Sequence, residues 1–549
     1  MLRRVIIIVL LLAAGWGGYR CFLRWQERRL VSQARKFLSA KDYRSAVLSA
    51  RQALQMDSGN VDACRVMAEL AGMACSPDGV YWLQRIAELG GGLRDQLAWC
   101  AASLRFGDLP SAEKALSSVK GADRQTVVFH QLAAAVQMAS GQLALAERHF
   151  EVAARLNPAN FQHQLNLADV RLRMNKPDLA ARAREVLSRL VERTESRDAA
   201  MRILLADAMT TKNMDKAVLL ARDLLKNDKA EWRDRLACLK ALHEGRDAAF
   251  AATLRKIQTE ATGREGDAFE LAVWMNRAGL SAQTVAWLAG WPPAKAGRPP
   301  LVAALAEAHV LCRNWKALRL LTETGEWGGM DFYRQAFSSR ARYEEGDRAG
   351  AQVQWRAAVA AAIKTPGAAM MLARAAGNWG WKTEMEDLLW QVAEGPSGQK
   401  WALQALYRQY QAECNTGGLY RVLTRILEID PEDGVARNNH TLLSLLTKVR
   451  TGSAFLSAEK LYRSQPDNPA FVSTYAFALH ERGQTDEALK VMGALKEEQL
   501  RAPAVALYQG VLLAAKGRMA EAEKYLALAA KGLLLPEEKV LLTQAGKRP

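Results

Sequence analysis

One pattern of glycines and small residues recurs along this 549-residue chain. Between residues 139 and 160 a glycine precedes a turn, small residues follow at helical spacing and a proline ends the pattern, at Gly141, Ala146, Ala153 and Pro158. Similar patterns begin near Lys41, Glu481 and Ala515. Apolar residues three or four positions apart indicate a helix face, and the glycine marks a tight turn between two helices. Because a lone hairpin of helices cannot bury its apolar face, the pattern predicts a row of stacked hairpins.

Composition agrees with an all-α chain. Apolar residues make up 50% of the sequence and proline is sparse at 16 residues, which favours long packed elements over disorder. The chain is rich in Ala, Leu, Arg and Glu, which favour helices, and it holds no convincing run of alternating β-branched residues.

The hairpin pattern resembles the tetratricopeptide repeat (TPR), in which two antiparallel helices occupy about 34 residues. Units of this length start near residues 27, 61, 93, 127, 161, 198, 231, 265, 299, 332, 365, 400, 435, 469 and 503. The resemblance implies an all-α, superhelical α-solenoid of about 15 TPR-like hairpins. The apolar N-terminal segment predicts that one transmembrane helix precedes it. We expect an anchor at 1–26, an N-terminal array at 27–230, a degenerate Trp-rich array at 231–460, and C-terminal units with a capping helix at 461–549.

The N-terminal segment indicates a membrane anchor. Residues 5–18 are apolar and free of charge, and residues 1–36 carry eight of the basic residues but only one acidic residue. With Arg20 reaching the interface, the run predicts a single-pass helix in the inner (cytoplasmic) membrane, its basic flank placing the body in the cytoplasm. A cleaved secretion signal, with Ala13 and Gly15 placed for cleavage, and a periplasmic body are the alternatives.

Motifs that carry chemistry are not evident. The glycine-rich stretch at 377–384, GNWGWKTE, lacks the Gly-Lys-Ser/Thr adjacency of a phosphate loop, because Trp381 separates Gly380 from Lys382. It is assigned instead to the turn inside one hairpin. We therefore predict no catalytic, cofactor-binding or metal-binding residue, and a protein that is not an enzyme.

The first helices of successive units predict a binding surface. Their concave positions hold an arginine stripe, Arg105, Arg173, Arg202, Arg235 and Arg277, with Trp232 and Trp401 at the starts of two first helices. Guanidinium groups match carboxylates, so the stripe predicts a groove for an acidic or extended peptide; a solvated helix face is the alternative. Beyond residue 435 these positions turn apolar, which suits an amphipathic helix or a second protomer, at Leu443, Leu446, Phe477, Leu507 and Val511.

Together these features predict a membrane-anchored TPR scaffold that mediates protein–protein interactions. The resemblance to anchored repeat proteins implies a role in bacterial envelope biogenesis. The alternative is an exported glycan-handling or exopolysaccharide-assembly protein, because ten of the 15 tryptophans lie between residues 274 and 401. Nucleic-acid binding is not favoured, since aromatic residues do not alternate with arginine at the concave positions.

Overall fold

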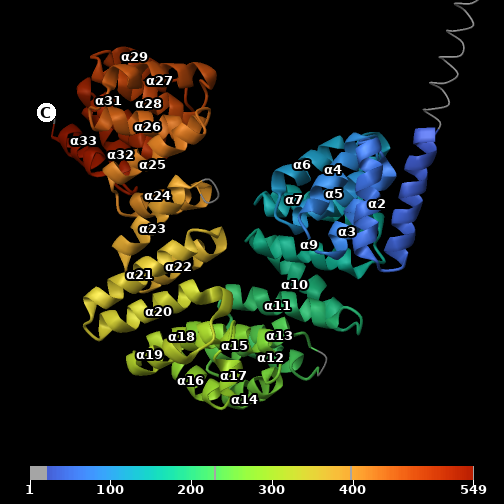
Figure 1. Cartoon of the computed structure of the whole chain (residues 1–549). Helices are drawn as coiled ribbons and strands as arrows, with labels where there is room; N and C mark the ends of the chain where they lie inside the picture. Colours follow the sequence, from blue (N-terminus) through green and yellow to red (C-terminus); the bar gives the residue numbers. More distant parts are fainter. Residues whose placement is uncertain (1–21, 228–229, 396–398, 548–549) are drawn as a thin grey trace, which may run out of the picture. The chain divides into compact units, whose positions relative to one another are not determined.

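The chain folds into helices throughout the part that the structure describes. The computed structural model describes residues 22–227, 230–395 and 399–547, and no strand occurs among them (Figure 1). The contacts divide the chain into two compact units, which meet in sequence at Glu260 and Ala261. The predicted boundaries at 230/231 and 460/461 both fall inside these units.

Unit 1 begins with a helix over residues 22–39. The elements that follow are α2 (Tyr43–Met56), α3 (Val61–Met73), α4 (Asp78–Glu88), α5 (Leu93–Arg105), α6 (Leu109–Ser118), η1 (Gly121–Gln125), α7 (Val127–Ala139), α8 (Leu143–Leu156), α9 (Phe161–Arg173), α10 (Pro177–Val191), α11 (Arg197–Thr210), α12 (Met214–Leu224), α13 (Trp232–Glu244) and α14 (Phe250–Ala261).

Unit 2 contains the remaining elements. They are α15 (Glu265–Arg277), α16 (Ser281–Ala289), α17 (Pro293–Ala296), α18 (Leu301–Leu311), α19 (Trp315–Thr324), η2 (Gly328–Met330), α20 (Asp331–Glu344), α21 (Arg348–Ala362), α22 (Pro366–Asn378), α23 (Lys382–Glu394), α24 (Gln399–Ala412), α25 (Thr416–Ile429), α26 (Gly434–Leu446), α27 (Thr451–Ser464), α28 (Pro469–Glu481), α29 (Thr485–Met492), α30 (Glu497–Leu500), α31 (Pro503–Ala515), α32 (Met519–Ala529) and α33 (Pro536–Gly546).

In both units consecutive helices pair into hairpins, and each hairpin packs against the next. The first helices start where the repeat frame places them: α7 at 127, α9 at 161, α28 at 469 and α31 at 503. The frame holds equally in the degenerate middle, where α24 starts at 399 and α26 at 434. The predicted all-α, TPR-like hairpin fold is therefore confirmed within each unit.

A left-handed residue joins the two helices of each hairpin. The turn residues with positive φ are Lys41, Cys75, Gly107, Gly141, Asn175, Lys212, Arg246, Gly279, Arg313, Gly346, Gly380, Cys414, Lys448, Gly483 and Gly517. In several turns the next residue is Asp or Asn, whose side chain accepts a hydrogen bond from the backbone three positions on; Asp108 accepts from Ser111 and Asn213 from Lys216. Gly380, in the stretch GNWGWKTE, has φ +73°, which confirms that this stretch is a hairpin turn.

Small residues bring the helices together as the repeat predicts. Ala146 and Ala153 of α8 and Ala522 and Ala529 of α32 are fully buried. Tyr43 occupies the position in the first hairpin that Trp381 occupies in a later hairpin, but 48% of the surface of Tyr43 is exposed. Trp381 packs against Tyr343 of the preceding hairpin, whereas the described part of the chain contains no hairpin before Tyr43.

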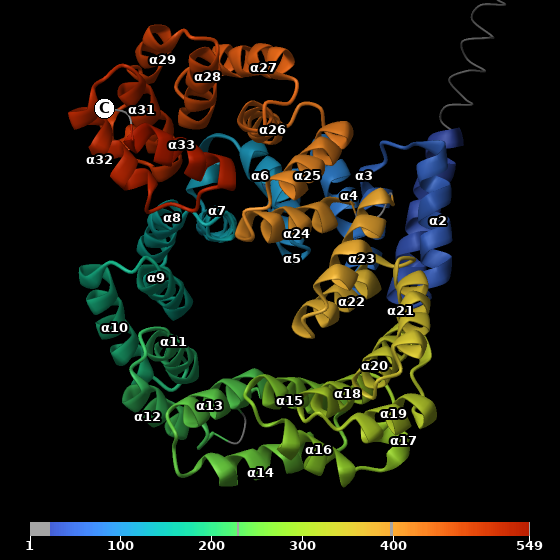
Figure 2. The same cartoon turned by 90° about the vertical axis from the view of Figure 1, so that its left-hand side faces the viewer.

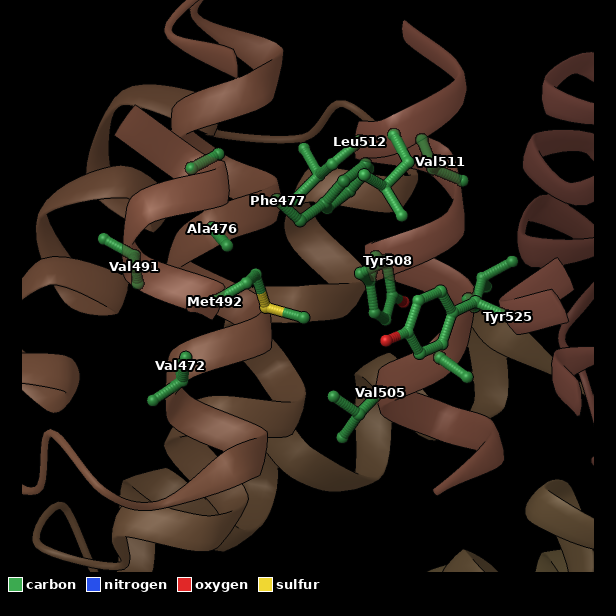
Figure 3. Packing of buried hydrophobic residues seen from close by; sticks show 14 of the residues in the cluster. Val472, Ala476, Phe477, Val491, Met492, Val505, Tyr508, Val511, Leu512 and Tyr525 are labelled. Carbon is green, nitrogen blue, oxygen red and sulfur yellow. The ribbon is translucent and has the colours of Figure 1, made fainter. Parts of the chain in front are cut away.

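The largest core lies in the C-terminal hairpins. Figure 3 shows Phe477 of α28, Met492 of α29 and Tyr508 of α31 packed together, with Tyr525 of α32 beside Tyr508. Helix α31 is buried along most of its length because α28, α29, α32 and α33 all pack on it.

The predicted single-pass location in the inner membrane requires correction. Among residues 22–227, 230–395 and 399–547, no helix has the length and apolar character needed to cross a bilayer. The apolar run at residues 5–18, which carries the anchor prediction, lies outside the described residues. The anchor and the transmembrane part of the predicted fold class therefore have no support.

Candidate functional site: the first-helix surface

Two arginines of the predicted stripe form ion pairs with carboxylates of unit 1. Arg202 on α11 donates from Nε and Nη2 to Asp234 on α13, at 2.5 and 2.6 Å. Asp234 is almost fully buried, so the guanidinium compensates a charge that water does not reach. Arg235 on α13 bonds Glu260 on α14 and also donates to the carbonyl of Ala230.

The other three arginines of the stripe are exposed. Arg173 is exposed and pairs with Asp169 one turn earlier on α9, at 2.9 Å. Arg105, at the end of α5, is exposed and has no ion-pair partner among the described residues. Arg277, the stripe residue in unit 2, lies near Glu307 on α18, whose pKa is raised by burial and lowered in part by that guanidinium. These three remain candidates for partner contacts.

The Arg202–Asp234 contact belongs to a recurrent type of bond between neighbouring hairpins. Arg35 bonds Asp62 at 2.8 Å, and Arg65 bonds Asp95 at 2.9 Å, in both cases linking the first helices of consecutive hairpins. The same kind of contact links second helices to the following hairpin, as in Arg184–Asp207 and Arg222–Asp247. Arg202, which the sequence assigned to a groove, therefore links two neighbouring hairpins.

The two tryptophans of the predicted surface lie at helix starts, as expected. Trp232 begins α13, and Trp401 is the third residue of α24. Both are half-buried. Trp401 packs against the core formed by α20–α26, and its indole Nε1 is shielded without a hydrogen-bond acceptor among the described residues. Trp401 therefore acts at least in part as a core residue.

The Trp-rich middle encloses an arginine of its own chain. The guanidinium carbon of Arg340 on α20 lies 5.7 Å from the ring centre of Trp315, 6.0 Å from that of Trp379 and 5.4 Å from that of Trp381. Arg340 also pairs with Glu344 at 2.7 Å, and burial lowers the pKa of its guanidinium. We refer to this arrangement as the Arg340 box.

The Arg340 box bears on the predicted glycan surface. Trp355 and Trp381 are buried, and their rings meet edge to face at 5.5 Å. Most of the surface of these two rings is thus covered by protein.

The apolar positions after residue 435 are covered by the chain's own C-terminal segment. Leu534 is buried in the C-terminal core, and Leu535 packs against the middle core. Helix α33 lies beside α31 and α32 (Figures 1 and 2), and Leu541 and Leu542 on α33 are partly buried there. We call residues 533–546 the C-terminal strap.

Two glutamates at the start of α33 hold the strap in place. The hydroxyl of Tyr508 on α31 donates to Glu538 at 2.8 Å, and Thr416 at the start of α25 donates to Glu537 at 2.6 Å. Beside them, Leu533 and Leu535 line a cavity of about 250 Å³ together with Leu443 on α26. Sequence reasoning expected only a helix that covers the end of the array.

The described residues contain no cluster of side chains that could bind a metal ion. No group of three or more His, Cys, Asp or Glu side chains lies close enough there to hold an ion. The closest histidine pair, His130 and His149, has its two Nδ1 atoms 2.9 Å apart, and burial lowers the pKa of both imidazoles.

Hairpin length and register define a TPR-like helical repeat protein. No family model matches the chain, and no curated protein matches it in sequence. Among solved structures, the APC/C hetero-tetramer Cut9–Hcn1 aligns over 84% of this chain and 98% of its own, with 13% identity and a TM-score of 0.28. Naa15/Naa10 bound to HypK-THB aligns over 97% of both chains, with 13% identity and a TM-score of 0.27. At this sequence identity and TM-score, the similarity to these structures does not add support for the fold described above.

Proposed function

We propose that this protein is a scaffold that binds other proteins through the first helices of its hairpins. The observation that carries the proposal is the C-terminal strap: its helix α33 packs on the first helix α31, where Glu538 accepts from Tyr508, and its Glu537 accepts from Thr416 at the start of α25. A surface that binds a helix of its own chain in this way has the chemistry to bind a helix of another protein.

The proposed scaffold performs no reaction itself. Buried histidines and cysteines such as His309 and Cys100 serve packing, and burial raises the pKa of the Cys100 thiol to about 12, which makes it a poor nucleophile. The predicted role in bacterial envelope biogenesis depended on the membrane anchor, and nothing in the described residues supports it.

Crosslinking in cells with the full-length chain as bait tests the proposal. We expect a reproducible set of crosslinked proteins whose contact sites map to exposed first-helix residues such as Arg105 and Arg173. Crosslinks spread evenly over both helices of every hairpin, or none above a bait of matched size and charge, would contradict a scaffold function.

A further inference from the structure

A second groove lies next to the C-terminal strap and is empty of protein. It is a cavity of about 740 Å³ between α24, α25 and α26. Its apolar lining consists of Leu403, Leu423, Ile426, Ile429, Val435 and Ala436. Tyr407, Leu423 and Asn439 line both this groove and the smaller cavity beside Leu533 and Leu535, so the two are continuous.

Large apolar side chains at this groove remain open to solvent. Ile429 is 46% exposed and Val435 is 66% exposed. The strap lies against another part of the same three helices, where Leu443 is buried. Covering Ile429 and Val435 with another apolar segment would therefore remove further apolar surface from water.

The charges of the groove divide between its two walls. On the α24 wall, Lys400 and Arg408 have no carboxylate partner in the described part of the chain, unlike Arg202, Arg184 and Arg222. On the opposite wall, the carboxylates already accept from backbone N–H groups: Asp430 from Glu432 and Asp433 from Ala436. The cations without a carboxylate partner therefore lie on α24, and the carboxylates of Asp430 and Asp433 lie on the opposite wall.

A hydroxyl donor completes the α24 wall. The oxygen of Tyr407 accepts a hydrogen bond from Nδ2 of Asn439 at 3.2 Å. Its own hydrogen has no acceptor among the described residues, so it is available to a carboxylate in the groove. At the strap, the hydroxyl group of Tyr508 on α31 donates its hydrogen to Glu538 in the same way.

The strap shows which kind of segment such a surface accepts. Residues 533–538 read Leu-Leu-Leu-Pro-Glu-Glu: Leu534 and Leu535 pack against apolar cores, and acidic residues at the start of a helix accept from hydroxyl groups. The open groove offers an apolar floor and a hydroxyl donor as well, with two cations in addition.

We propose that the groove between α24, α25 and α26 binds a segment of a partner protein in which aliphatic residues precede an acidic helix start. The aliphatic side chains cover Ile429 and Val435, and the carboxylates bond Tyr407 and pair with Arg408 and Lys400. This inference rests on the proposed scaffold function and names the site and the chemistry of its ligand. It is tested with purified components, so its failure is distinct from a failure to find partners in cells.

The probe is a fluorescein-labelled synthetic peptide with the sequence of residues 530–547, titrated with the full-length chain while its anisotropy is read. The α33 helix of the chain occupies the strap site, so the open groove is the vacant site for the peptide. We expect Arg408→Glu to weaken binding about tenfold, as the loss of one charge-assisted contact implies. Replacement of both peptide glutamates, Glu537→Gln and Glu538→Gln, should weaken binding by a similar factor.

Matched variants separate the groove from general surface effects. Val435→Asp should weaken binding strongly, whereas Val353→Asp on α21, a valine of nearly equal exposure at 64%, should leave it unchanged. Arg189→Glu on α10, exposed and outside the groove, controls for the change in net charge.

Three results would overturn the proposal. One is the absence of saturable binding by the wild-type chain. Another is binding that Arg408→Glu and Val435→Asp leave undiminished, because the peptide would then have exchanged with α33. The last is concentration-dependent self-association of the full-length chain that Arg408→Glu abolishes, since the occupant would then be a second copy and not a partner.

Discussion

Tyr508 and Glu538 lie thirty positions apart in sequence and share a buried hydrogen bond of 2.8 Å that ties helix α33 to the first helix α31. Tyr508→Phe removes the donor and leaves the buried carboxylate with one partner fewer, so we expect it to destabilise the C-terminal hairpins by about 1–3 kcal/mol. Hydrogen exchange should rise over residues 533–546 before it rises in α28. Tyr81→Phe, at an exposed tyrosine, is the control.

The same bond makes the stability of the C-terminal hairpins sensitive to alkaline pH. Burial and Glu538 raise the pKa of Tyr508 well above its ordinary value. Because the folded pKa is raised, the contribution is complete below the unfolded tyrosine pKa of about 10 and is lost as the pH rises through the folded value. Urea unfolding between pH 8 and pH 11 should show this loss in the wild-type chain and a smaller one in Tyr508→Phe; equal slopes would contradict it.

The Arg202–Asp234 pair should contribute to the stability of unit 1. Arg202→Ala leaves Asp234 buried without its cation, and we expect a loss of about 1–3 kcal/mol, below that of a fully buried pair because Arg202 is partly exposed. Arg173→Ala, at an exposed pair, should cost less than about 0.5 kcal/mol. Chemical denaturation of the two variants measures the difference. Equal effects would mean that Arg202 is ordinary surface.

The Arg340 box predicts different outcomes for two substitutions. Arg340→Ala leaves a cavity between three indole rings and should destabilise unit 2 by about 2–5 kcal/mol. Arg340→Met fills most of that volume without a buried charge and should be nearly neutral or stabilising. Thermal unfolding followed by tryptophan fluorescence distinguishes the two. A methionine variant as unstable as the alanine variant would show that the charge itself is required.

The hairpin turns predict that removing a glycine destabilises the protein and that introducing one stabilises it. Gly380 has φ +73°, and no described residue occupies the space that a methyl group on its Cα would fill. Gly380→Ala should therefore lower the free energy of unfolding by about 1–2 kcal/mol, through backbone conformation alone. Lys212 occupies the equivalent turn with φ 57°, and Lys212→Gly should stabilise by up to about 1 kcal/mol. Urea unfolding measures both changes. Gly452→Ala, in the first turn of α27 with φ in the ordinary range, is the control for adding a methyl group.

The sequence by itself determined the local structure of this protein. Helix propensity, the spacing of residues such as Ala146 and Ala153, and turn residues such as Gly380 act within one or two hairpins, so the helices and their register follow from neighbouring residues even in the degenerate middle. The tertiary structure decided how polar groups are used. Three features depend on contacts between residues 30 or more positions apart, which periodicity does not encode. They are whether Arg202 pairs with a partner protein or with Asp234, whether Trp381 faces solvent or Arg340, and where the glutamates of α33 lie.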